Sequence, residues 1–213
     1  MVPARPLARS SVRIGAPWIL VGVVWLAAVI GGFAILWRYA AQRGSDSLAP
    51  ATWPAATALA RDPSRPTLLM FVHPRCACSR ASVVELGHLL ARVRGRVAPT
   101  IVFVRPRGAD DRDFDRGELR TLAASVPGVA LFDDAGGVEA RRFGAATSGA
   151  TLLYDAGARL AFAGGLTSVR GHEGDSFGQE RIVALVSGGT ADRADSPVFG
   201  CALEDNSQPG GTQ

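Results

Sequence analysis

The chain has 213 residues, of which 47% are hydrophobic and 20% are charged, and its formal net charge is +4. This composition excludes a predominantly disordered protein, and three cysteines are too few for a small domain built on several disulfides. Every basic residue is an arginine, and the excess of positive charge lies in the first 49 residues, because residues 50–213 hold equal numbers of arginines and acids. A neutral body lacks the basic surface that nucleic-acid binding requires, so we expect no nucleic-acid partner.

A long apolar segment near the N-terminus predicts a membrane anchor. Residues 16–37 carry no charge, and a helix of this length reaches about 33 Å, enough to cross a hydrocarbon layer of about 30 Å. More arginines precede this segment than follow it, which favours a cytoplasmic N-terminus. We therefore expect a short basic cytoplasmic tail (1–15) and one transmembrane helix (16–38) in the inner membrane, with the body in the periplasm or another extracytoplasmic space. The alternative is a cleaved signal peptide, whose apolar region is usually shorter.

Composition divides the rest of the chain into a spacer, a domain and a tail. Residues 39–64 are rich in Ala, Ser and Pro, and we expect a juxtamembrane spacer with at most a short helix over 53–61. A folded domain is expected over residues 65–189, followed by a polar C-terminal tail over 190–213.

Apolar runs alternate with helical patterns inside the expected domain. The order strand, helix, strand, helix, strand, hairpin, helix predicts an α/β fold with a parallel core, to which the hairpin adds antiparallel strands. The first helix is expected to begin at the cysteine pair after the first strand, and apolar residues recur at helical spacing from Val83 to Val93. The expected strands are 67–72, 99–104, 128–132, 150–154 and 159–163, and the later helices are 116–126 and 177–186.

Two cysteines, Cys76 and Cys78, lie where the first strand gives way to the first helix. Free backbone N–H groups and the helix dipole stabilise a thiolate at such a position, and His73 and Arg75 add positive charge nearby. We expect Cys76 to be the nucleophile and Cys78 to resolve the mixed disulfide that it forms. The pattern therefore predicts redox or metal chemistry at this turn.

The chain resembles the thioredoxin-like superfamily over about residues 65–189. The strings FVHPRCACSRASVVE (71–85) and TSGATLLYDAGARLAFAGGLTSVRGHEGD (147–175) resemble the RedB-type membrane-anchored thioredoxin-like proteins. The resemblance implies an α/β fold with a thioredoxin-like mixed sheet flanked by helices, together with one N-terminal transmembrane helix. It also implies a redox-active pair at Cys76 and Cys78.

Three features depart from the superfamily pattern. One residue instead of two separates the cysteines, so a disulfide between them would close a small, strained and therefore oxidising ring. Arg75 replaces the usual tryptophan, and Ala150 stands where the superfamily has a cis-proline that shapes substrate docking. We expect a trans bond before Ala150, because a cis bond there would cost about 2.5–4 kcal/mol.

Further candidates are expected at the same edge of the sheet. The loop RGHEG contains Arg170, His172 and Glu173, which follow the last strand and could shuttle protons or hold a metal beside the cysteines. Cys201 lies in a small apolar island of the tail and would serve as a resolving partner or a third ligand if the tail folds back. The alternatives are a solvated surface loop and a cysteine that is packed against the body or left free.

These observations leave three functions open. The first is a membrane-anchored thiol–disulfide oxidoreductase that needs no cofactor and acts on protein thiols or disulfides outside the cytoplasm. The second is a copper-binding, metallochaperone-like module in which Cys76, Cys78 and His172 hold Cu(I), because thiolates suit this soft ion. The third is a scaffold that has kept the fold without the chemistry, which the alanine at position 150 would favour.

Overall fold

The computed structural model describes residues 15–45, 47–105, 117–188 and 194–203. The chain forms two compact units, Met1–Tyr39 and Ala40–Gln213. Almost all of the expected basic tail, and the last ten residues of the expected C-terminal tail, lie outside the described residues.

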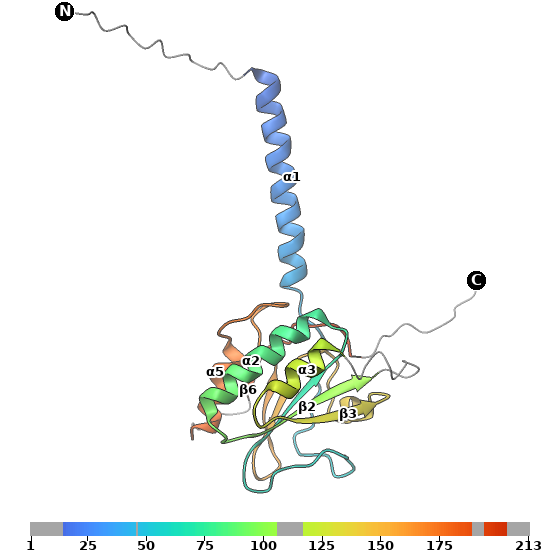
Figure 1. Ribbon diagram of the computed structural model, residues 1–213. Helices are drawn as coiled ribbons and strands as arrows, with labels where there is room; N and C mark the ends of the chain where they lie inside the picture. Colours follow the sequence, from blue (N-terminus) through green and yellow to red (C-terminus); the bar gives the residue numbers. More distant parts are fainter. Residues whose placement is uncertain (1–14, 46, 106–116, 189–193, 204–213) are drawn as a thin grey trace, which may run out of the picture. The chain divides into compact units, whose positions relative to one another are not determined.

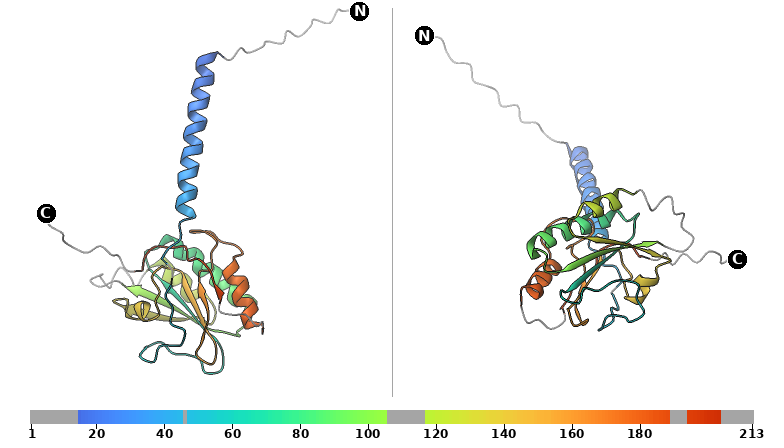
Figure 2. Two further views of the ribbon diagram at one scale, coloured as in Figure 1. Left: turned by 180° about the vertical axis from the view of Figure 1, so that it is seen from behind. Right: turned by 60° about the horizontal axis from the view of Figure 1, so that its bottom comes forward.

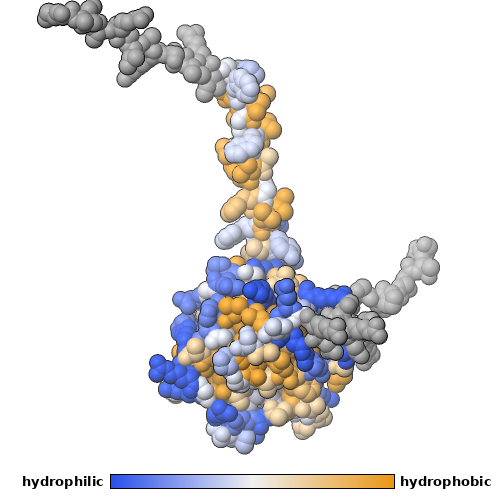
Figure 3. Space-filling view, in the orientation of Figure 1, coloured by the Kyte–Doolittle hydropathy of each residue, from blue (hydrophilic) through white to orange (hydrophobic). Residues whose placement is uncertain are grey.

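The N-terminal unit contains the helix α1 (Ala16–Ala40). Its apolar side chains are exposed along its length, as Figure 3 shows. Its length and composition suit a helix that crosses a membrane, and it is the one such helix in the described part of the chain. The predicted N-terminal apolar helix is therefore confirmed.

The second unit is built on a mixed sheet with the strand order β3-β2-β1-β4-β5-β6. The central strand β1 (Thr67–Val72) pairs in parallel with β2 and antiparallel with β4. All six of its residues are buried, because β1 has neighbours on both sides and packing on both faces. The other strands are β2 (Ala98–Arg105), β3 (Ala130–Ala135), β4 (Ala150–Tyr154), β5 (Leu160–Gly164) and the two-residue β6 (Ala194–Asp195).

Helices cover one face of this sheet (Figures 1 and 2). They are α2 (Ala77–Val93), α3 (Glu118–Ser125) and α5 (Phe177–Val186), and their apolar side chains share a core with alternate residues of β1 and β2. The expected apolar stripe of α2 is buried, with Leu86 at 1% exposed and Leu89 at 0%. The helical period of the sequence thus identified the buried side of α2.

Irregular segments and the short helix α4 (Val138–Arg142) cover the opposite face. The indole of Trp53 packs edge-on against the rings of Phe143 and Tyr154, with centroids 5.1 and 5.2 Å away. Residues 53–61 form turns and bends and not the short helix that the sequence suggested. A side chain provides a hydrogen-bond partner for the backbone there, since the N–H of Ala58 donates to Glu139 Oε1 at 3.2 Å.

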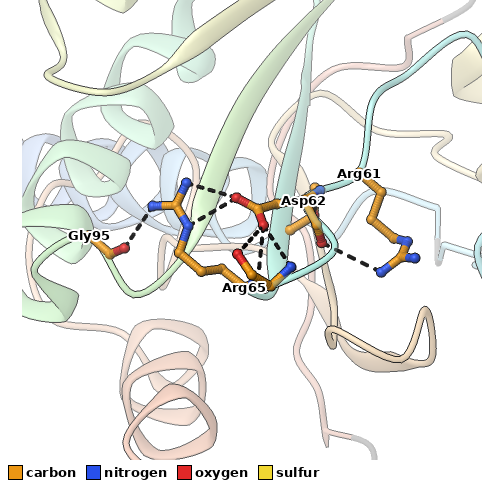
Figure 4. A network of polar contacts seen from close by, with 6 residues as sticks. Arg61, Asp62, Arg65 and Gly95 are labelled. Atoms are coloured by element: carbon orange, nitrogen blue, oxygen red, sulfur yellow. Dashed lines mark hydrogen bonds and ion pairs between the residues drawn. The ribbon is translucent and has the colours of Figure 1, made fainter.

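A turn at Asp62 joins the start of β1 to two distant loops (Figure 4). The Asp62 carboxylate accepts hydrogen bonds from the Ser64 hydroxyl and backbone and from Arg65, which hold its pKa well below the usual range. The Arg65 guanidinium also donates to the carbonyl of Gly95 after α2, at 2.9 Å, and Arg61 donates to the carbonyl of Ala156 in the β4–β5 turn. This network fixes the end of the sheet remote from the cysteines.

Candidate functional site: a three-thiol edge

The first cysteine of the pair caps the N-terminal end of α2. Cys76 has extended backbone angles (φ −84°, ψ 113°), and α2 begins at the next residue. A tight turn leads into it from β1, in which the Cys76 N–H donates to the carbonyl of His73 at 3.0 Å. The Arg75 N–H donates to Nδ1 of His73 at 3.2 Å, so this imidazole supports the turn. Cys76 is buried (5% exposed), while Cys78 is half-buried.

Ser148 ties three segments together beside Cys76. Its hydroxyl oxygen accepts a hydrogen bond from the N–H of His73 at 2.7 Å and lies 2.6 Å from the hydroxyl oxygen of Ser79 in the first turn of α2. Its own N–H donates to the carbonyl of Cys201 at 2.8 Å. Ser148 itself is 1% exposed, so the end of β1 and the start of α2 meet at its buried side chain, and the C-terminal segment is joined to its backbone.

The C-terminal segment returns to this edge and brings the third cysteine with it. The Sγ atoms of Cys76 and Cys201 lie 3.0 Å apart. Thr147 and Ala202 form an antiparallel bridge, and the Leu203 N–H donates to the carbonyl of Ala146 at 2.9 Å. Short backbone pairing, in addition to side-chain packing, therefore places Cys201.

Burial and hydrogen bonding act in opposite directions on the thiol of Cys76. Burial raises its pKa, but polar groups of Cys201 and Ser79 stabilise the thiolate and together lower the pKa to about 7. The groups that lower the pKa of Cys76 are a neighbouring thiol and the serine of the first helical turn.

The other two thiols are shifted in the opposite direction. Burial, the hydrogen bond to Cys76 and the negative charge of Cys76 raise the pKa of Cys201 to about 12. Burial and the charge of Cys76 also raise the pKa of Cys78. Arg170 opposes both shifts through its positive charge, so it is the residue of the RGHEG loop that acts on the sulfurs. At neutral pH the cluster therefore carries its negative charge on Cys76.

The structure places the remaining candidates around this cluster. Ala150 begins β4 and pairs with Phe71, and no cis peptide bond occurs in the described residues. His172 and Glu173 are exposed, whereas Arg170 is half-buried and donates through Nε to the carbonyl of Gln42 at 3.1 Å. The described residues hold no group of three or more His, Cys, Asp or Glu side chains arranged for a metal ion. The expected copper ligands Cys76, Cys78 and His172 are thus not assembled into one site here.

A surface cavity of about 320 Å³ opens beside Cys76. Among the described residues, its walls come from the turn before α2, from the first residues of α2 and from the start of α3. They are Pro74, Arg75, Cys76, Ala77, Arg80, Glu118 and Leu119. Cys76 therefore lines a space that a second molecule could enter, and Cys201 is not part of its described lining.

Sequence reasoning did not identify two residues of this site, Ser79 and Ser148. Ser148 lies in the string TSGAT, whose departure from the superfamily pattern is the alanine at position 150. A hydroxyl that joins residues 75 positions apart leaves no local pattern, so only the assembled sheet reveals it.

Comparisons with known proteins agree with this architecture. No protein-family model matches the chain, and no curated protein matches it in sequence. It is similar in structure to a hypothetical protein from Sinorhizobium meliloti (TM-score 0.52, 20% identity, 77% of this chain and 93% of the other). It is also similar to an uncharacterized conserved protein from Geobacillus kaustophilus, with a TM-score of 0.54 and 16% identity. That likeness covers 79% of this chain and 94% of the other.

A weaker likeness, with a TM-score of 0.40 and 18% identity, is found to a secreted disulfide oxidoreductase from Mycobacterium tuberculosis. It covers 58% of this chain and 81% of the other. At these identities the likenesses speak to fold alone. The structure thus shows an α/β fold with a mixed sheet flanked by helices, preceded by one N-terminal apolar helix, as the resemblance of the sequence to the thioredoxin-like superfamily implied.

Proposed function

We propose that this chain is a membrane-anchored thiol–disulfide oxidoreductase in which Cys76 is the nucleophile. The observation that carries the proposal is the setting of the Cys76 thiol at the N-terminal end of α2. There it is hydrogen-bonded by its neighbours and borders an open cavity. A thiol whose pKa is about 7 is roughly half ionised at neutral pH, close to the optimum for an attacking sulfur.

The chemistry requires one attacking thiol and one resolving thiol. The Cys76 thiolate attacks a sulfur of a partner disulfide, and a second thiol of this chain then displaces the partner from the mixed disulfide. Two thiols are close enough to influence Cys76 electrostatically, namely Cys78 of the C-x-C motif and Cys201. The same steps in reverse reduce this chain and oxidise the partner.

The proposed location is supported by α1 and by the distribution of arginines. An uncleaved α1 in the inner membrane would hold the body in the periplasm, where protein thiols and disulfides are the available partners. The strings at residues 71–85 and 147–175 support assignment to the RedB-type membrane-anchored proteins. Neither assignment requires a cofactor.

The test is the pH dependence of alkylation of the reduced full-length chain in detergent, with each cysteine followed separately by mass spectrometry. We expect half-maximal reactivity of Cys76 near pH 7, and Cys76→Ser should abolish exchange with a model protein disulfide. Ser79→Ala removes one group that stabilises the thiolate, so it should raise the apparent pKa of Cys76. A Cys76 that titrates near 9, like an ordinary thiol, would contradict the proposal.

Copper binding is separated from redox chemistry by a second measurement on the same protein. A reduced chain that retained one equivalent of Cu(I) against a competing chelator, yet exchanged no disulfide, would replace the oxidoreductase by the copper module. A chain that did neither would be the scaffold.

A further inference from the structure

We propose that Cys201 is the thiol that pairs with Cys76, so that the redox-active disulfide joins residues 125 positions apart rather than the two cysteines of the C-x-C motif. The proposal rests on the function proposed above and identifies its resolving residue. It gives the C-terminal segment, residues 198–203, a direct part in the exchange reaction.

Distance is the first argument. The Sγ atoms of Cys76 and Cys201 are 3.0 Å apart, and a disulfide bond is about 2.05 Å long, so the two sulfurs need to approach by only about 1 Å. Cys201 is exposed as a residue, although its sulfur is partly desolvated against Cys76, so the partner that reduces the bond again can approach from the Cys201 side.

The geometry of the helix disfavours the alternative pair. Cys78 lies in the first turn of α2, two residues after the extended N-cap position that Cys76 occupies. Its thiol is also close to Cys76, since a side-chain hydrogen bond to Cys76 contributes to the raised pKa of Cys78. A bond between Cys76 and Cys78 would close a small, strained ring at the first turn of α2, whereas a bond between Cys76 and Cys201 leaves that turn as it is.

Backbone contacts hold Cys201 in place independently of its sulfur. Residues on both sides of it are buried, with Phe199 at 7% exposed and Leu203 at 0%. The segment is further fixed where the Gly44 N–H donates to the carbonyl of Val198 at 2.9 Å. Gly200 lies so close to the carbonyl oxygen of Ser148 that a Cβ atom there would overlap it. The close approach explains why the residue before Cys201 is glycine.

The cavity beside Cys76 supplies the approach for the partner. Its described walls come from the α2 and α3 side, whereas Cys201 arrives from the segment paired with residues 146–148. A partner sulfur in the cavity and the sulfur of Cys201 would thus reach Cys76 from different directions. Displacement at a sulfur atom needs this arrangement, because the entering and leaving sulfurs cannot occupy the same place.

The exchange balances with a partner protein disulfide as the oxidant. The Cys76 thiolate attacks one partner sulfur, the partner S–S bond breaks, and the other partner sulfur leaves as a thiolate. Cys201 then loses its proton to solvent, and its thiolate attacks the sulfur of Cys76. The mixed bond breaks and the second partner thiolate leaves. The partner has gained two electrons and become a dithiol, while Cys76 and Cys201 have become a disulfide.

Arg170 assists the step in which Cys201 ionises. Its positive charge favours the thiolate form of Cys201, against the burial and the negative charge of Cys76 that favour the thiol. When Cys76 is engaged in a mixed disulfide it carries no charge, and one obstacle to ionisation of Cys201 disappears. Formation of the mixed disulfide therefore favours ionisation of Cys201.

The test compares Cys201→Ser with the matched variant Cys78→Ser in the full-length chain, mixed with a model protein disulfide. We expect Cys201→Ser to accumulate the mixed disulfide at Cys76 at least about tenfold over Cys78→Ser, because a tethered resolving thiol acts at a millimolar effective concentration. Peptide mapping of the oxidised wild-type chain should identify the Cys76–Cys201 linkage. Accumulation in Cys78→Ser alone, with a Cys76–Cys78 linkage, would overturn this inference and leave the proposed function standing.

A second pair of variants tests the placement of the segment without touching a thiol. Gly200→Ala should weaken the docking of residues 198–203 and reduce the yield of the Cys76–Cys201 linkage. Gly87→Ala is its control, since a Cβ there makes only ordinary contacts with Val126 at 3.9 Å. Equal linkage yields in the two variants would contradict the role of the docked segment. If no variant, nor the wild-type chain, formed a mixed disulfide at Cys76, the proposed function would fail together with the inference.

Discussion

The two faces of the sheet are covered in different ways. On one face, α2, α3 and α5 lay continuous apolar stripes against β1 and β2. On the other, Trp53 and Leu59 of an irregular segment pack with Phe143 and with Val198 and Leu203 of the C-terminal segment. Both faces are buried, and the close sulfur pair draws Cys76 from the start of α2 and Cys201 from the irregular cover. Segments that read as spacer and tail can thus belong to the core and to the site.

The largest expected effect tests whether the irregular cover is as well packed as the helical one. Phe143→Ala removes a fully buried ring in contact with Trp53, Phe71 and Tyr154, and Leu89→Ala removes a fully buried side chain of α2. We expect losses in the free energy of unfolding of about 3–5 kcal/mol and about 2–5 kcal/mol respectively, measured by chemical denaturation in detergent. A loss below about 1 kcal/mol for Phe143→Ala would mean that the irregular face is only loosely covered.

A smaller effect tests how the helical face holds the RGHEG loop. The carboxylate of Glu85 in α2 is 1% exposed, and it accepts hydrogen bonds from the Gly174 N–H and from Nε2 of Gln179, each at 2.7 Å. Glu85→Gln presents an amide to these two donors, and we expect it to lower the free energy of unfolding by about 1–3 kcal/mol.

His88→Gln is the matched control for Glu85→Gln. The His88 side chain is 64% exposed and touches Glu85 only at 3.4 Å. A change within about 0.5 kcal/mol is expected for this variant. Equal effects of the two substitutions would show that the buried carboxylate does not anchor the loop.

The smallest effect is expected at the turn that precedes β1 on the irregular side. Hydrogen bonds from Ser64 and Arg65 lower the pKa of Asp62 in the folded chain below its ordinary value of 3.8. The stabilisation is therefore present above pH 3.8 and is lost as the pH falls through the folded-state pKa. Asp62→Asn should lower the thermal midpoint slightly at pH 7 and leave it unchanged at pH values where Asp62 is protonated. A difference that grew on acidification would contradict this account.

The parts of the fold that were predictable from the sequence have a regular period. β1 is a continuous apolar run. The apolar residues from Val83 to Val93 predict α2, because apolar residues recur about every 3.6 positions in a helix that is buried on one side. The five-residue helix α4 and the two-residue strand β6 were not predicted, because each is too short to show a period. β3 starts two residues later than expected because Gly128, with φ +78°, still belongs to the turn before it.

The candidate site was predictable only where it is local in the sequence. The position of Cys76 at the end of a strand and the start of a helix could be read from the residues around it. Cys201, which helps to lower the pKa of Cys76, could not be recognised from the sequence as a neighbour of Cys76. It is placed by backbone hydrogen bonds to residues 146–148, and such bonds do not depend on the identity of the side chains.

The return of the chain to residues 146–148 has a consequence for thermodynamics. A covalent link between Cys76 and Cys201 would turn most of the folded body into a closed ring, since the two residues are 125 positions apart. In the chain-entropy model, a ring of this size restricts the denatured ensemble by about 5 kcal/mol at 25 °C, close to the upper end for such cross-links. Reduction would return that entropy to the denatured chain, so the melting temperature of the protein would report its own oxidation state.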